Sequence, residues 1–160
     1  MVNAVKLLLL SGTPLLWGYV WHRAMWSYHL YGVSLGLLSA VFYLYWCGVG
    51  YLAARWIRSP LPALVIGNVF GALILVLNLY QALVLERYLS NDVGTWSQLF
   101  YLPALRLAVV LQDVLMLFVQ TTRHTWLTFT LSFLLMLAVY YAGFKKGQRD
   151  RSKKENPFVS

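Results

Sequence analysis

The sequence predicts an all-α fold, a polytopic membrane helix bundle with short loops. Of the 160 residues, 60% are hydrophobic and 11% are charged, whereas about 25% are charged in an average soluble domain. A chain this short has too little interior to hide so much apolar surface from water. Residues 24–54, 59–85 and 124–144 also contain no Lys, Arg, Asp or Glu. Each of these stretches is at least as long as the segment of about 20 residues that crosses a membrane.

The first predicted span covers about residues 2–21. Gly12 and Pro14 interrupt its apolar run, so we expect a kink there, which neighbouring helices can accommodate by satisfying the broken backbone hydrogen bonds. Lys6 precedes the run as in a signal peptide, but no A-x-A cleavage site follows. We therefore interpret this segment as a retained helix.

Aromatic residues mark the ends of the second, third and last predicted spans, which correspond to the three charge-free stretches. Indole and phenol rings favour the headgroup level, where the ring is half buried and its N–H or O–H stays hydrated. The residues at these ends include Trp21, Trp26, Tyr51, Trp56, Trp126, Tyr140 and Tyr141. Their positions agree with the span boundaries that the charges indicate.

A further apolar segment, residues 99–119, contains Arg106 and Asp113. Each charge costs about 2.5–3.5 kcal/mol at the centre of a spanning helix, whereas each Leu, Val or Phe returns about 0.3–0.6 kcal/mol, so that insertion is nearly balanced. The alternative is a helix that lies in the membrane interface. Arg106, Asp113 and Gln120 recur at intervals of seven and form a narrow stripe, which suits a helix packed inside a bundle. We favour five transmembrane helices, with four as the alternative.

Basic residues predict the orientation of the chain. Six of the 13 Lys and Arg residues lie in the last 16 positions: Lys145, Lys146, Arg149, Arg151, Lys153 and Lys154. Such a cluster beside a span is typical of a cytoplasmic flank. Five spans then place eight basic residues inside and four outside, and four spans place nine inside and four outside. Either way, we expect an integral protein of the cell's inner membrane with its C-terminus in the cytoplasm.

The same charges divide the chain into two parts. We expect a transmembrane helix bundle over residues 1–146 and a disordered basic tail over residues 147–160. The bilayer is the main expected partner, and the tail is predicted to contact anionic lipid headgroups. No aromatic residues alternate with the basic ones in the tail, so we expect no nucleic-acid partner.

Small residues indicate close helix contacts. Gly32 and Gly36 form one G-x-x-x-G pattern, and Gly67 and Gly71 form another. Glycine allows helix backbones to approach closely and gain dispersion contacts. We interpret the pattern as packing within this bundle. The alternative is contact with a second copy or with another membrane protein.

Polar residues at membrane depth form the candidate functional set: Arg106, Asp113, Gln120, Asn68 and Asn78. Ionisable side chains in a span are rare and by default mark functional sites. Arg106 and Asp113 are about 10.5 Å apart along a helix axis, so each is expected to meet a partner elsewhere. For the two Asn side chains, hydrogen bonds between helices are the ordinary interpretation.

Catalytic patterns are absent from the sequence. It has no G-x-S-x-G turn, no P-loop and no close carboxylate pair, and its single Cys47 belongs to no zinc pattern. We expect no enzyme activity, no cofactor and no metal. The predicted function is an accessory, assembly or sensory subunit of a membrane complex. The alternative is a small channel or transporter subunit with a polar path along residues 99–119, which requires Arg106 and Asp113 to face a hydrated cavity.

Overall fold

The computed structural model describes residues 2–28, 33–86, 92–119 and 124–155. This part of the chain folds into helices and contains no strand, which confirms the all-α class. The helices are α1 (Val2–Ser11), α2 (Thr13–Tyr28), α3 (Val33–Trp56), α4 (Pro60–Leu83), α5 (Asp92–Val119) and α6 (Thr125–Glu155).

Five helical segments are long and apolar enough to cross a membrane, as the fold prediction requires. They are Val2–Ser27, Leu35–Trp56, Pro60–Leu83, Gly94–Leu117 and Thr125–Lys154. The first comprises α1 and α2, which meet at Gly12. Pro14 has no N–H to donate to the carbonyl of Leu10, and the Thr13 hydroxyl donates to that carbonyl instead, at 2.7 Å. The expected break therefore occurs, and its backbone is satisfied locally.

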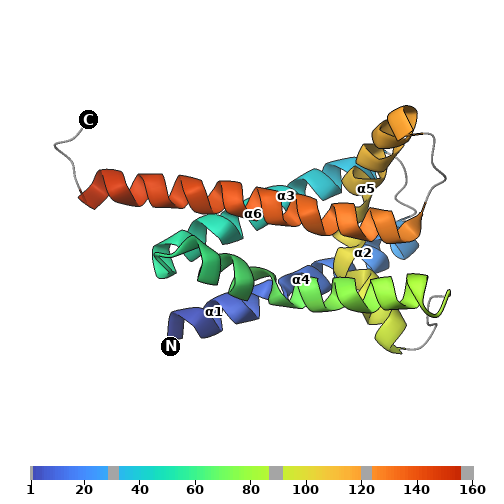
Figure 1. Cartoon of the computed structure of the whole chain (residues 1–160), viewed down its shortest axis with the longest axis horizontal. Coiled ribbons are helices and arrows are strands. Elements are labelled where there is room, and N and C mark those ends of the chain that lie inside the picture. Colours follow the sequence, from blue (N-terminus) through green and yellow to red (C-terminus); the bar gives the residue numbers. More distant parts are fainter. Residues whose placement is uncertain (1, 29–32, 87–91, 120–123, 156–160) are drawn as a thin grey trace.

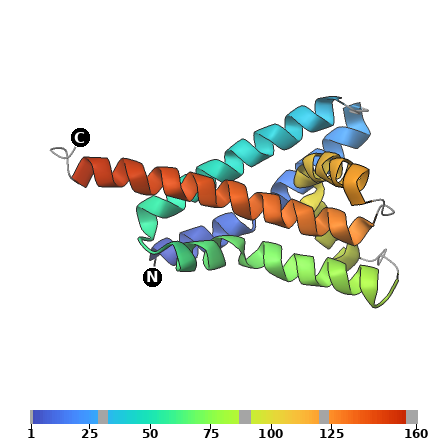
Figure 2. The same cartoon turned by 45° about the horizontal axis from the view of Figure 1, so that its top comes forward.

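Four of these segments run along the long axis of the molecule, and α5 runs across it. Figure 1 shows α1 beginning and α6 ending toward the same end, whereas α5 lies at the opposite end. Figure 2, turned by 45°, again shows α5 confined to that end. Helix α5 contacts α2, α3, α4 and α6. It therefore closes one end of the bundle.

Contacts between α5 and α6 confirm this crossing. The Tyr101 ring packs on the Phe129 ring, with centroids 5.8 Å apart. Eleven residues further along α5, Gln112 accepts a hydrogen bond from Thr128, the residue next to Phe129. Eleven helical residues cover about 16 Å. Because this length of α5 meets neighbouring positions of α6, the two helices cross steeply.

Helices α3 and α6 form the main internal contact and meet at glycines. A Cβ atom on Gly50 would overlap the backbone carbonyl of Tyr140, and one on Gly143 would overlap that of Cys47. Glycine at these positions lets the two backbones touch. Large aromatic side chains fill the rest of the core, among them Phe42, Trp46, Phe100, Tyr101, Tyr140 and Phe144.

The C-terminal helix continues beyond its apolar part. Helix α6 has 31 residues, or about 46 Å at 1.5 Å per residue, against a hydrocarbon core of about 30 Å. Residues 147–155 are helical, whereas the composition predicted a disordered tail over residues 147–160; residues 156–160 lie outside the described residues. Its Arg, Lys and Gln residues are good helix formers, and Asp150 precedes Lys154 by four positions, the favourable order for an ion pair along a helix.

Tertiary contacts also hold the start of this extension. Gly147 lies against the Tyr51 backbone and the Ala54 side chain. The Gln148 side-chain amide donates to the carbonyl of Arg58 at 2.9 Å, which ties α6 to the connection between α3 and α4. Sequence composition does not reveal these contacts.

Candidate functional site

The polar residues predicted to line a path lie in separate places. Asn78 is sealed between α4 and α5. Asn68 borders an open apolar groove between α4 and α6. Arg106 is exposed on α5. Gln120 lies outside the described residues. Asn68, Asn78 and Arg106 therefore lie in three different surroundings.

Asn78 belongs to a buried polar junction that joins α4 to α5. Its amide nitrogen donates to the Ser97 carbonyl at 3.2 Å, and the Ser97 hydroxyl contacts its amide oxygen at 3.0 Å. The amide nitrogen of Gln81 donates to the same hydroxyl at 3.2 Å. Asn78 and Gln81 have no exposed surface. The junction satisfies its own polar groups and leaves no room for a solute.

A second buried polar junction joins α5 to α6. Gln112 accepts a hydrogen bond from the Thr128 hydroxyl, and its amide nitrogen donates to the His124 carbonyl at 3.3 Å. The Ser132 hydroxyl donates to the Thr128 carbonyl at 2.8 Å. This junction, together with Gln81 and Ser97, was not predicted from the sequence, where Asn68, Asn78 and Gln120 were the only uncharged polar candidates. The alignment of Asn78 with Gln81 at i, i+3 was the available signal.

Removing the Ser97 hydroxyl tests whether the α4–α5 junction stabilises the fold. In Ser97→Ala, Asn78 and Gln81 both lose a buried contact, and leaving a buried group unsatisfied costs about 1–3 kcal/mol. We expect a lower thermal midpoint in detergent. Thr95→Ala, an exposed position on the same helix, is the matched control and should change little. Equal midpoints for the two variants would contradict a stabilising role.

Arg106 lies on the outside of the bundle, whereas the narrow stripe suggested an interior position. It borders a hollow of about 150 Å³ with residues of α2 and α3, including Trp21 and Ser39. Asp113 is half-buried two turns further along α5. A helix that lies across the end of a bundle can expose an arginine to the membrane interface, where its charge stays hydrated. Arg106 therefore borders this hollow from an exposed position on α5.

The glycines singled out from the sequence have different surroundings. Gly67 faces the Tyr140 ring, and Gly71 faces the Phe133 ring, at 3.1 Å from an added Cβ. Both accommodate aromatic side chains of the same chain. Gly36 has open space around it, and Gly32 lies outside the described residues. The close backbone contacts instead use Gly18, Gly50, Gly143 and Gly147, of which the last two form a G-x-x-x-G pattern that was not singled out from the sequence.

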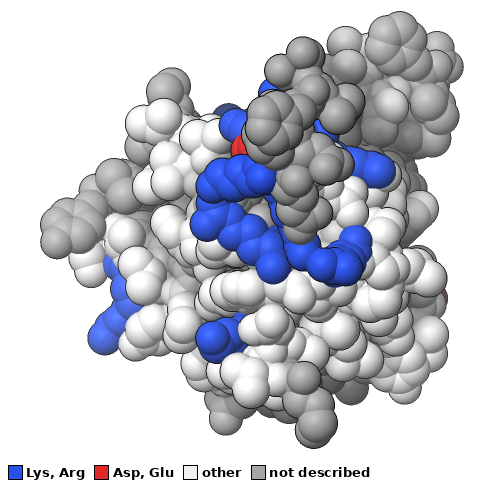
Figure 3. All heavy atoms as spheres, turned by 90° about the vertical axis from the view of Figure 1, so that its left-hand side faces the viewer, with Lys and Arg blue, Asp and Glu red and all other residues white. Residues whose placement is uncertain are grey.

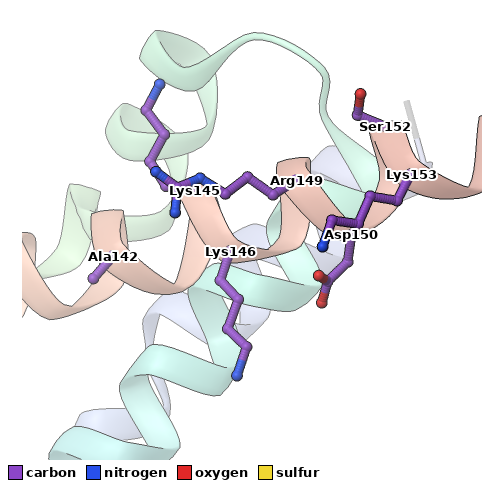
Figure 4. A pocket seen from close by; sticks show the side chains of 7 residues that line it. All are labelled: Ala142, Lys145, Lys146, Arg149, Asp150, Ser152 and Lys153. Carbon is purple, nitrogen blue, oxygen red and sulfur yellow. The ribbon is translucent and has the colours of Figure 1, made fainter. Parts of the chain in front are cut away.

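Basic side chains gather at the end of the molecule where α6 finishes. Figure 3 looks onto this end and shows Lys and Arg grouped over it. One side of the α6 extension, which we call the outer face, is shown in Figure 4 and is lined by Ala142, Lys145, Lys146, Arg149, Asp150, Ser152 and Lys153. The opposite side faces α3 and is lined by Tyr51, Arg55, Gly147, Asp150, Arg151 and Lys154. This end carries most of the positive charge of the chain.

Together, these features define a class: an all-α bundle with membrane-spanning lengths, sealed polar junctions and a projecting basic helix. Among the described residues, no group of three or more His, Cys, Asp or Glu side chains could hold a metal ion. No family model, no curated protein and no solved structure matches the chain. The geometry of the chain itself must therefore support any functional proposal.

Proposed function

We propose that this protein is a non-enzymatic accessory subunit that holds a rigid basic helix at the cytoplasmic surface of a membrane complex. The observation that carries the proposal is the continuous α6 helix, which extends beyond its apolar part and is fixed at its base by α3. A preformed helix loses less conformational entropy on binding than a disordered tail. Such an element suits docking to an acidic partner.

The arrangement of the helices supports a topology with four crossings. Helix α5 would then lie in the interface on the side opposite the basic end, although its length and composition also permit spanning. Lys6, Arg55, Arg58 and the six basic residues of the tail fall on one side, which gives nine of 13. The charge asymmetry agrees with a cytoplasmic location for this side.

The transport alternative has less support. A conducting path needs polar groups that converge on a hydrated cavity, whereas Asn78 and Gln112 are each locked in hydrogen bonds between helices. Aromatic side chains fill the interior between the two junctions. The sealed junctions favour a scaffold whose polar groups fix how its helices pack.

Charge and position indicate the partners of the basic end. Its Lys and Arg side chains favour anionic lipid headgroups by about 1 kcal/mol each near the surface. The outer face of α6 also suits an acidic surface on another subunit, because it presents four cations along about two and a half turns. Those cations are Lys145, Lys146, Arg149 and Lys153.

Site-specific photo-cross-linking in cells tests the docking role. A cross-linker at Lys153, on the outer face, should give a discrete adduct with one protein partner. The same reagent at Leu117, an exposed residue of α5, is the matched control and should give lipid adducts. Replacing Lys145, Lys146 and Arg149 with Gln should reduce the protein adduct at position 153 several-fold, because the electrostatic attraction falls. Lipid adducts alone at both positions would contradict the proposal.

A further inference from the structure

We infer that the groove between α3 and the α6 extension is a discrete binding site for the phosphate of one anionic phospholipid. We call this feature the inner groove; it has a volume of about 440 Å³ and is lined by Tyr51, Arg55, Gly147, Asp150, Arg151 and Lys154. It deepens the proposed function, because it rests on that function's placement of the basic end at the membrane surface. It differs from the outer face in being formed by two helices.

The depth of the inner groove matches the headgroup layer. Arg55 is the first charged residue after the charge-free stretch 24–54, and Lys145 is the first after 124–144. Arg151 lies seven residues beyond Phe144, or about 10 Å along α6. The headgroup region on each side of the hydrocarbon core is about 5–8 Å thick, and arginine side chains can reach back toward it. A lipid phosphate therefore lies within reach of the groove.

The side chain of Arg55 is held in place at the inner groove before any lipid binds. The Arg55 guanidinium lies over the Tyr51 ring, 5.0 Å from its centroid, and donates to the Tyr51 hydroxyl at 3.2 Å. Gln148 anchors the Arg58 backbone to α6. Arg58 and Arg151 border an adjoining hollow of about 250 Å³. Arg151 lines both hollows and so lies between the other two arginines.

The chemistry of these groups favours a phosphate over other anions. A guanidinium offers five N–H donors in a planar fork that can bind two phosphate oxygens together. Among the described residues that line the two hollows, the cations Arg55, Arg58, Arg151 and Lys154 outnumber the carboxylate of Asp150. The apolar ends of α3 and α6 lie directly beside the groove. A phospholipid can bind the cations through its phosphate and the apolar helix ends through its acyl chains. A free phosphate can bind only the cations.

The test measures lipid binding to the purified full-length protein in neutral detergent. Phosphatidylglycerol should bind with a stoichiometry of one per chain, and phosphatidylcholine should bind much more weakly. Each neutralised cation should weaken binding about fivefold, because each charge contributes about 1 kcal/mol to the binding free energy. Arg55→Gln with Arg151→Gln should therefore weaken binding about 30-fold. Lys146→Gln with Lys153→Gln removes the same charge from the outer face and should weaken binding less than threefold.

Three results of this comparison would overturn the inference, and a lysine variant provides a fourth. The three are equal losses in the two double variants, equal binding of the two lipids, or inorganic phosphate binding as tightly as phosphatidylglycerol. Arg55→Lys with Arg151→Lys keeps the charge and removes the planar forks, so it should fall between the wild type and the glutamine variant; unaltered affinity would contradict a built phosphate site. Binding in detergent does not depend on orientation in cells, so failure of the proposed docking role leaves this result unchanged.

Discussion

Replacing Gly143 with alanine should destabilise the protein by about 1–3 kcal/mol, as added atoms do in a well-packed interior, and replacing it with leucine should prevent folding. The reason is the contact between α3 and α6. A single Cβ at position 143 would overlap the carbonyl of Cys47, and a backbone atom in a helix cannot move aside as a side chain can. The two helices would have to separate along their length.

A thermal midpoint measured in detergent checks this expectation. For a chain of this size, 1 kcal/mol corresponds to roughly 2–4 °C, so Gly143→Ala should melt several degrees below the wild type. Gly36→Ala and Gly48→Ala are matched controls, because a Cβ at either position meets no atom within 4 Å. Both should leave the midpoint unchanged or raise it slightly, since alanine is the better helix former. The same loss at positions 36 and 143 would show that close packing of α3 on α6 does not determine stability.

The helical class and most of the segment boundaries follow from the sequence because charge and hydropathy are local properties. Residues 59–85 lack charges, and α4 occupies Pro60–Leu83. The break at Gly12 follows from backbone chemistry, because Pro14 cannot donate a hydrogen bond. Both predictions rest on neighbouring residues alone, and the structure confirms both.

Other features depend on contacts between distant residues. Hydropathy shows that residues 99–119 form a long apolar segment, but it does not show how the resulting helix is oriented relative to the other helices. The steep crossing arises from contacts such as Ser97 with Asn78 and Tyr101 with Phe129. The tail was expected to be disordered from its composition, whereas Gly147 and Gln148 tie its base to α3 and the following connection. Such pairings have no signature in a single sequence.

The candidate site residues also show that contacts between distant residues are not evident from the sequence. Arg106 and Asp113 stand out in the sequence because they are charged in an apolar segment, yet Arg106 lies on the outside. Gln81 and Gln112 attract little notice in the sequence, yet both are almost fully buried and join helices. An uncharged polar residue costs less to place in a membrane than an ion, so it stands out less in an apolar segment. A residue that stands out little in the sequence can still join two helices.

Helix α5 lies across the end of the bundle, and we propose that the chain crosses the membrane four times, in place of the five crossings favoured from the sequence. Single cysteines introduced into a Cys47→Ser background test it with a membrane-impermeant thiol reagent on intact cells. The positions are Asn3→Cys, Thr95→Cys, Thr125→Cys and Ser152→Cys, all of which are exposed. Labelling after cell lysis provides the control for thiol accessibility.

The four-crossing account predicts that positions 95 and 125, which flank the body of α5, are both labelled from outside the cell. Positions 3 and 152 should both be protected until lysis, because the proposed topology places the start of α1 and the end of α6 on the cytoplasmic side. At each position, labelling before lysis should be either nearly complete or nearly absent relative to labelling after lysis. Labelling of 3 and 125 with protection of 95 and 152 would place the two ends of α5 on opposite sides, and that result would contradict the account.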